Sequence, residues 1–169
     1  SRTVKPFFYA FEKLGITIDT DSKYYTVHHP GIQPNEIVLY EAGDVVTETV
    51  IMAAAKIPGT TVIKFASANY QVQDVCHYLE LLGVKIEGVG TTTVTVHGVA
   101  NLNQDVTYNI GEDPIEAMSL IAIGIVTKSP ITIMRCPIDF LELELLKLEK
   151  MGQKFKRSPV YLSYNNKTR

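Results

Sequence analysis

The sequence predicts a mixed α+β fold of stacked repeats, in which apolar helices lie inside and strands lie outside. The first observation is a helix–Gly–strand pattern that recurs at Gly15, Gly83 and Gly152, where successive glycines are 68 and 69 residues apart. The second is a pair of apolar helical runs, 46–57 and 115–126, each followed by a β-rich run. A helix that is apolar on nearly every side is normally buried, and stacked repeats supply that burial.

Composition limits the class of protein. The 169 residues are 46% hydrophobic and carry a net charge of -2, so a disordered chain is excluded and nothing favours nucleic-acid binding. The longest apolar runs fall short of the ~20 residues that span a bilayer. We therefore expect one cytoplasmic domain over residues 1–169, with no membrane partner. Its repeat units are predicted at 1–40, 41–110 and 111–169.

The first unit is partial and begins with its second helix near Val4. This helix should end at Gly15, because glycine adopts the left-handed conformation that ends helices without a Cβ clash. An alternating run follows, which is typical of a strand, and a final strand is predicted over 24–28.

The second unit contains every expected element. The apolar helix 46–57 is followed by a strand over 61–65 and by an amphipathic helix that ends at Gly83. Strands over 84–87 and 93–97 should form a hairpin around the glycines of 88–90.

The third unit repeats this order with weaker signals. Asp113, Pro114 and Glu116 form a helix start, because aspartate caps a helix and proline suits its first turn. A helix over 115–126 and strands over 131–134 and 160–164 are expected, and Asp139 is predicted to cap the unit's second helix.

The segment 43–99 resembles the enolpyruvyl transferases, above all the UDP-N-acetylglucosamine 1-carboxyvinyltransferases. The carrying residues are Thr47-Glu48 before the Met/Ala-rich helix, the run 59–63, the run 84–91 and the run 96–99. Residues 113–116 and the segment from Arg2 to Gly15 extend the resemblance over nearly the whole chain. It implies an inside-out α/β barrel of βαβαββ repeats, of which this chain would hold about two and a half.

The resemblance also implies a reaction. The enolpyruvyl group of phosphoenolpyruvate would pass to the 3′-hydroxyl of UDP-N-acetylglucosamine with release of phosphate, toward peptidoglycan. These two molecules are the expected partners, and no cofactor or metal is implied. The family's reactive cysteine would fall upstream of residue 1. We therefore expect no catalytic residue in this chain and no activity from it alone.

Substrate-binding residues follow from the resemblance at two segments. Arg2 corresponds to a family arginine that meets phosphate groups, although it is also compatible with an ordinary exposed arginine. Val4, Lys5 and Pro6 correspond to the segment along the uridine ring, where binding is largely by main chain.

Gly43, Asp44 and Val45 correspond to the turn that holds the UDP diphosphate through backbone N–H groups. This sequence departs from the family there, because Glu41 and Asp44 put carboxylates beside the expected diphosphate. Asp44 is also a good helix N-cap, and that structural role is favoured.

Cys76 and Cys136 are interpreted as packing residues, because neither has a basic partner at helical spacing. Exposed apolar helix faces of an incomplete barrel suggest a homodimer. Two other functions stay open: an enzyme like 5-enolpyruvylshikimate-3-phosphate synthase, and a degenerate repeat domain used for binding.

Overall fold

The computed structural model describes residues 3–167, which divide into two compact units. Unit 1 ends at Thr107 and unit 2 begins at Tyr108, close to the boundary predicted between the second and third repeats. Within residues 3–167, no helix combines the length and the apolar character needed to cross a membrane.

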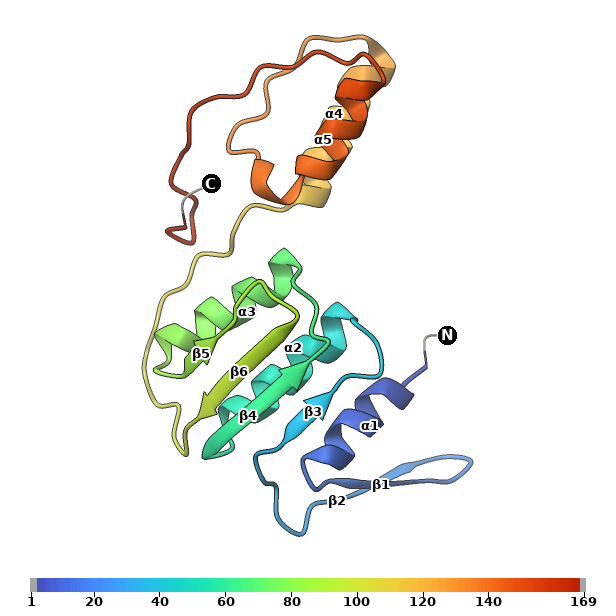
Figure 1. The fold of residues 1–169 in the computed structure, drawn as a ribbon, viewed down its shortest axis with the longest axis vertical. Helices are drawn as coiled ribbons and strands as arrows, with labels where there is room; N and C mark the ends of the chain where they lie inside the picture. The colour runs from blue at the N-terminus through green and yellow to red at the C-terminus, as the bar shows by residue number, and fades with distance from the viewer. Residues whose placement is uncertain (1–2, 168–169) are drawn as a thin grey trace. The chain divides into compact units, whose positions relative to one another are not determined.

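Unit 1 contains three helices and two sheets (Figure 1). Its helices are α1 (Lys5–Lys13), α2 (Asp44–Ala55) and α3 (Tyr70–Leu81). Its strands are β1 (Thr17–Thr20), β2 (Tyr25–His28), β3 (Glu36–Val38), β4 (Gly59–Lys64), β5 (Lys85–Glu87) and β6 (Thr93–Gly98).

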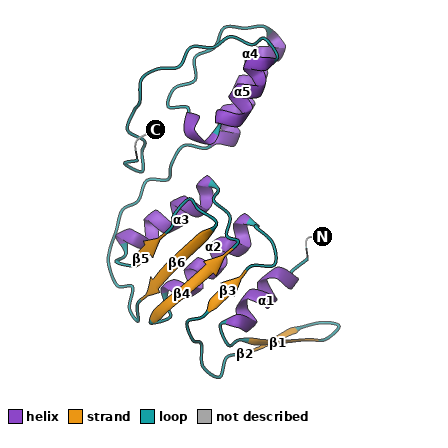
Figure 2. Ribbon diagram, in the orientation of Figure 1, coloured by secondary structure: helices purple, strands orange, loops and turns teal. Residues whose placement is uncertain are grey.

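The strands form a separate hairpin and a four-stranded sheet (Figure 2). β1 and β2 pair antiparallel, while the larger sheet has the order β3-β4-β6-β5. β3 runs parallel to β4, and β6 runs antiparallel to both β4 and β5. The predicted hairpin of the second unit is therefore confirmed.

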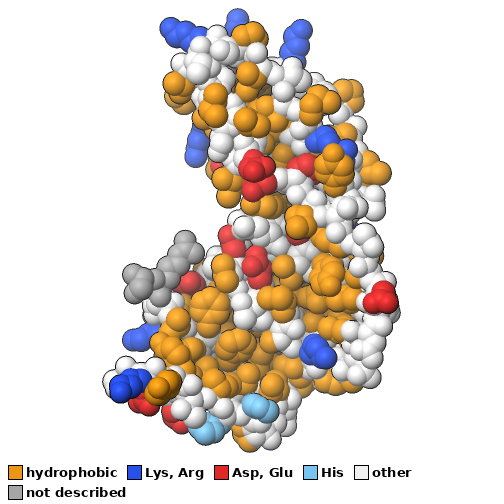
Figure 3. All heavy atoms as spheres, turned by 180° about the vertical axis from the view of Figure 1, so that it is seen from behind, with side chains coloured by type: hydrophobic (Ala, Val, Ile, Leu, Met, Phe, Trp, Pro, Cys, Tyr) orange, Lys and Arg blue, Asp and Glu red, His pale blue; other side chains and the backbone are white. Residues whose placement is uncertain are grey.

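The core of unit 1 lies between this sheet and α2. Thr61 and Ile63 of β4 are fully buried while their neighbours along the strand are more exposed, so one face of the sheet is covered. Val50 and Ile51 of α2 are also buried. The opposite side of α2 stays partly open, since Met52 is 49% exposed. Hydrophobic side chains gather on this unit in the view of Figure 3.

The same turn ends one helix in each repeat. Gly15, Gly83 and Gly152 have φ of 91°, 92° and 89°. In each turn the amide after the glycine donates to a carbonyl five residues earlier, at 3.1 Å from Ile16 to Phe11 and 3.0 Å in the other two repeats. This is the Schellman arrangement, and it confirms the predicted helix ends.

The regular elements in the described part of unit 2 are helices, apart from an isolated bridge. Unit 2 contains α4 (Pro114–Thr127), a short 3₁₀ helix η1 (Ile138–Phe140) and α5 (Glu142–Lys150). Its buried apolar residues are Ala117, Leu141 and Leu145. Asp113 caps α4, where its Oδ1 accepts from the Ile115 amide at 2.7 Å.

Three expectations for unit 2 are wrong. The segments 131–134 and 160–164 form no regular strand, apart from an isolated bridge at residue 162. The helix 115–126 is not buried, since Ile123 is 57% and Val126 80% exposed. Asp139 does not cap α5, because the 3₁₀ turn of η1 displaces the helix start and Leu141 takes that position.

A physical difference between the units accounts for the first two of these outcomes. β4 is paired on both of its edges, by β3 and β6, and this sheet covers α2. The described part of unit 2 has no such pair of neighbours for 131–134, so its backbone lacks ladder partners and α4 lacks a sheet to cover it.

We expect Gly83→Ala to destabilise unit 1 by about 1–2 kcal/mol, the cost of a left-handed conformation for a residue with Cβ. The new Cβ would also lie 3.1 Å from Gln104 Nε2. Denaturant-dependent hydrogen exchange of α3 and β5 amides measures the effect. Gly31→Ala is the matched control, because its Cβ meets nothing within 4 Å. Equal stabilities of the two variants would contradict the role of Gly83.

Candidate functional site

The two segments predicted to bind substrate lie at helix starts at one end of unit 1. α1 and α2 both begin at that end (Figure 1), and the Tyr9 and Tyr40 rings, 6.3 Å apart between centroids, link α1 to the segment before α2. Arg2 lies outside the described residues.

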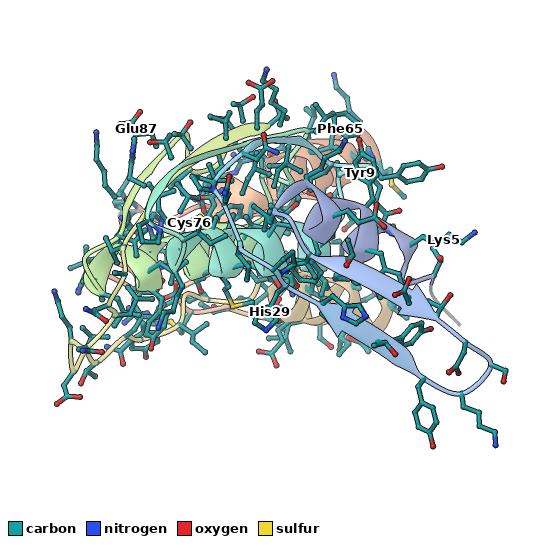
Figure 4. All side chains as sticks on the ribbon, turned by 90° about the horizontal axis from the view of Figure 1, so that it is seen from below. Lys5, Tyr9, His29, Phe65, Cys76 and Glu87 are labelled. Carbon is teal, nitrogen blue, oxygen red and sulfur yellow. The ribbon has the colours of Figure 1, made fainter. Side chains whose placement is uncertain are left out.

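Val4 to Pro6 form the start of α1. Val4 is the N-cap residue, and its carbonyl accepts from the amides of Phe7 and Phe8 at 3.1 and 3.3 Å. Pro6 is buried, whereas the Lys5 side chain points away from the protein (Figure 4).

Gly43 begins α2 as its N-cap residue. Its carbonyl accepts from the amide of Thr47 at 3.1 Å and from the Thr47 hydroxyl at 2.7 Å. The same hydroxyl oxygen accepts from the Ser67 amide at 3.0 Å, so the buried Thr47 joins the start of α2 to the segment before α3.

Asp44 is not the N-cap residue that the sequence suggested, because it already lies inside the helix. Its side chain instead crosses to the segment before α3. The Ser67 hydroxyl donates to Asp44 Oδ1 at 2.5 Å, and the side-chain Nδ2 of Asn69 donates to Asp44 Oδ2 at 2.8 Å. The structural role of Asp44 therefore stands, but as a link between two helix starts.

Carboxylates surround this helix start. A Cβ placed on Gly43 would lie 3.1 Å from Glu41 Oε1, which puts that side chain beside the turn. Burial raises the pKa of Glu48, and the charge of Asp44 raises it further. The dipole and free N–H groups at the start of α2 favour an anion, and here the protein's own carboxylates already supply negative charge.

A second polar cluster in unit 2 was not found from the sequence. Arg135 Nε donates to Glu112 Oε1 at 3.0 Å, and the Ser163 hydroxyl donates to Glu112 Oε2. The Arg135 side chain also donates to the Leu162 carbonyl at 2.9 Å and stacks 3.5 Å from the centre of the Tyr164 ring. These contacts join residues that are 23 to 51 positions apart, and no spacing rule connects them.

Arg135 has φ of 55°, which is uncommon for a residue with Cβ. The Tyr161 hydroxyl donates to the Arg135 carbonyl at 2.8 Å, so both the backbone and the side chain of Arg135 are held. The cluster fastens the C-terminal segment onto the start of unit 2 and takes the place of the missing strand pairing.

A hollow of about 1320 Å³ opens in unit 2. It is bounded by the C-terminal half of α4, the segment 128–136 and the segment 153–158, and its exposed lining is mainly apolar. None of the predicted binding residues that the structure describes is among its lining.

The cysteines behave as packing residues. Cys76 is fully buried within unit 1 (Figure 4), and burial, with a smaller contribution from Glu80, raises the pKa of its thiol to about 12. Burial also raises the pKa of Cys136. Neither thiol is activated as a nucleophile. Among residues 3–167, no group of three or more His, Cys, Asp or Glu side chains could hold a metal ion.

A family model described as EPSP synthase (3-phosphoshikimate 1-carboxyvinyltransferase) matches residues 1–168. The chain belongs to this family. The enolpyruvyl transferase NikO from Streptomyces tendae shares its fold, with a TM-score of 0.76 at 18% identity over 94% of this chain and 41% of that one. The predicted fold, an incomplete inside-out α/β barrel, is thereby confirmed.

Two sequence relatives carry the same description. The chain is 35% identical over 143 residues to the UDP-N-acetylglucosamine 1-carboxyvinyltransferase of Bradyrhizobium diazoefficiens. The matched segment is 85% of this chain and 33% of that protein. It is 32% identical over 162 residues to that of Treponema pallidum, or 96% of this chain and 36% of that protein. The chain thus spans about a third of the length of these curated relatives.

The Glu112 cluster predicts acid sensitivity. Burial raises the pKa of Glu112, but hydrogen bonds from Ser163, its own backbone, Arg135 and Tyr164 outweigh burial, and the folded-state pKa is lowered. The unfolded chain therefore binds the proton first as pH falls. The stabilisation is present above the ordinary glutamate range and is lost as pH falls through the folded pKa.

We expect Glu112→Gln to lower the stability of unit 2 at neutral pH and to flatten its loss of stability in acid. Hydrogen exchange of α4 amides across a pH series, corrected for intrinsic rates, measures this. Glu149→Gln is the control, because Glu149 pairs with Arg157 in an exposed contact. If the stability of the Glu112→Gln variant fell with pH as steeply as that of the unchanged protein, Glu112 would not be the source of the acid sensitivity.

Proposed function

We propose that the protein containing this chain transfers the enolpyruvyl group of phosphoenolpyruvate to the 3′-hydroxyl of UDP-N-acetylglucosamine, releasing phosphate. The observation that supports this most strongly is the identity of 35% and 32% to two proteins described as UDP-N-acetylglucosamine 1-carboxyvinyltransferases. In this role the protein acts in the cytoplasm, in peptidoglycan precursor synthesis, cell-wall biogenesis and cell shape.

The chain's own contribution is to bind the nucleotide sugar. Val4, Lys5 and Pro6 at the start of α1 lie along the uridine, and Gly43, Asp44 and Val45 at the start of α2 face the diphosphate. Arg2 pairs with phosphate oxygens through its guanidinium. Two helix starts at one end of unit 1 support this role, because both present backbone N–H groups and a positive dipole end. The proposed transfer requires no cofactor bound to this chain.

Phosphate release tests the reaction. The intact protein that contains this chain is given phosphoenolpyruvate with UDP-N-acetylglucosamine, and shikimate 3-phosphate is offered in parallel. We expect turnover with the nucleotide sugar and none from residues 1–169 alone, because the proposed reactive cysteine segment is supplied from outside them. Turnover with shikimate 3-phosphate would show that this molecule is the acceptor in place of UDP-N-acetylglucosamine. Turnover by residues 1–169 alone would overturn the proposal that this chain only binds substrate.

A second candidate function is a binding domain without catalysis. It is favoured by the carboxylate of Asp44 at the start of α2, which already accepts hydrogen bonds from Ser67 and Asn69 in the segment before α3. It also agrees with the exposed apolar side chains of α4, which offer a surface to a second copy in a homodimer. A folded intact protein that neither turns over nor binds UDP-N-acetylglucosamine would favour this candidate.

Asp44→Asn tests whether the diphosphate lies beside Asp44. The asparagine oxygen can still accept from Ser67, but the negative charge is gone. Two unit charges about 4 Å apart in water repel by about 1 kcal/mol, so we expect about fivefold tighter binding of UDP-N-acetylglucosamine by calorimetry. Asp105→Asn, an exposed aspartate elsewhere in unit 1, should leave binding unchanged. Equal affinities for all three proteins would place the diphosphate away from Asp44.

A further inference from the structure

The hollow of unit 2, about 1320 Å³ in volume, has an apolar interior. Ile121 and Ile125 line it from α4, about one turn apart along the helix. Ile133 and Phe155 line it from the two irregular segments. Leu145 of α5, which is 4% exposed, belongs both to this lining and to the buried cluster of the unit. The interior of the hollow is therefore continuous with the packed core.

The segment that follows α4 is fixed at two places and forms a definite wall. The Ser129 amide donates to the Gly124 carbonyl at 3.0 Å, next to the end of the helix. A Cβ on Gly124 would lie 2.7 Å from Ile131 Cδ1, so Ile131 packs against the helix where that side chain is missing. Farther along, the Tyr161 hydroxyl holds the carbonyl of Arg135. The hollow thus lies between a helix and a segment anchored beside it.

The charges around the hollow have one sign. Its lining contains five Lys and Arg side chains and no Asp or Glu. The two arginines each pair with a glutamate outside the lining. The other three cations are exposed lysines that form no ion pair within the described part of the chain. They are Lys128, Lys154 and Lys156. In a chain of net charge -2, this is a local excess of positive charge.

Apolar walls and unpaired cations together specify a class of ligand. The walls favour a hydrocarbon body, because its burial removes apolar surface from water. The lysines favour an anionic head, since each is a compact positive charge on a flexible stem. A neutral apolar molecule would leave the lysines without a partner. A nucleic acid binds mainly through its phosphates and would leave the apolar walls uncovered.

We propose that the hollow of unit 2 binds a single-chain amphiphile with an anionic head, of the class of the long-chain carboxylates. The hydrocarbon chain lies between α4 and the segment 153–158, against Ile125, Ile133 and Phe155. The carboxylate lies among the exposed ammonium groups of the lining. The proposal does not rest on the enolpyruvyl reaction, because the described substrate-binding residues of that proposal are in unit 1.

Calorimetry with matched probes tests the class of ligand. The full chain is titrated at neutral pH with dodecanoate below its micelle concentration, and we expect saturable binding of one molecule per chain. Hexanoate keeps the charge but loses half of the hydrocarbon, so it should bind at least about a hundredfold more weakly. Dodecyltrimethylammonium keeps the hydrocarbon but reverses the charge, and it should bind at least about tenfold more weakly.

A pair of double variants tests the role of the lysines. Lys154→Gln with Lys156→Gln removes two charges from the lining and should weaken dodecanoate binding by about tenfold. Lys147→Gln with Lys150→Gln is the control, because it removes the same charge from exposed lysines of α5 outside the lining. This control should bind dodecanoate as the unchanged chain does. Hydrogen exchange of α4 amides checks that both variants stay folded.

Nuclear magnetic resonance of isoleucine methyl groups locates the ligand. Dodecanoate should shift the methyl signals of Ile125 and Ile133, which line the hollow. The signals of Ile51 and Ile63, which are buried in unit 1, should stay unchanged.

Four outcomes would overturn the proposal. Dodecanoate fails to bind saturably, or the two double variants lose affinity equally, which would indicate a general effect of charge. In the third, the chain binds phosphatidylglycerol vesicles but takes up no monomeric dodecanoate, so a bilayer surface is the partner. In the fourth, light scattering shows a dimer that excludes dodecanoate, so a second copy fills the hollow.

Discussion

The burial of α2 is the constraint on which the rest of unit 1 depends. This helix is apolar on almost every side, so it needs cover from several directions. The sheet covers one side through β4 and β6, and α1 and α3 pack beside it. The approach is so close at Gly98 that any Cβ there would lie 2.1 Å from the Ile57 carbonyl oxygen. α4 has the same apolar character without a sheet against it, and unit 2 accordingly keeps exposed apolar side chains.

Much of this architecture could be predicted from the sequence because its signals are local. A glycine with positive φ after an amphipathic run ends α1, α3 and α5, and a strand follows the glycine after α1 and after α3. Alternation then identifies β6, with Val94 and Val96 facing inward. The strand expected at 131–134 has a similar composition, yet composition cannot say whether ladder partners lie on both sides. Strand formation depends on those neighbours, which are distant in the sequence.

The candidate site was likewise predicted only in part from the sequence. Its location at two helix starts came from the family resemblance, but the expectation that Asp44 caps its own helix was wrong. An aspartate near a helix start can cap its own helix or bond elsewhere, and the choice depends on where Ser67 and Asn69 lie. The Glu112 and Arg135 cluster had no sequence signal at all. Its members meet because the C-terminal segment returns to the start of α4, which is a property of the tertiary fold.

Internal repetition allows one repeat to be compared with the other. Two copies of one strand, β2 and β6, differ in their surroundings but share a threonine, a valine and a histidine paired with a carboxylate, at 26–28 and 95–97. β6 is paired on both edges, whereas β2 pairs with β1 alone within the described residues, and Val96 is 0% exposed where Val27 is 55% exposed. Because a buried valine and an exposed valine at equivalent positions differ by the free energy of hydrophobic burial, the open strand is the less stable copy.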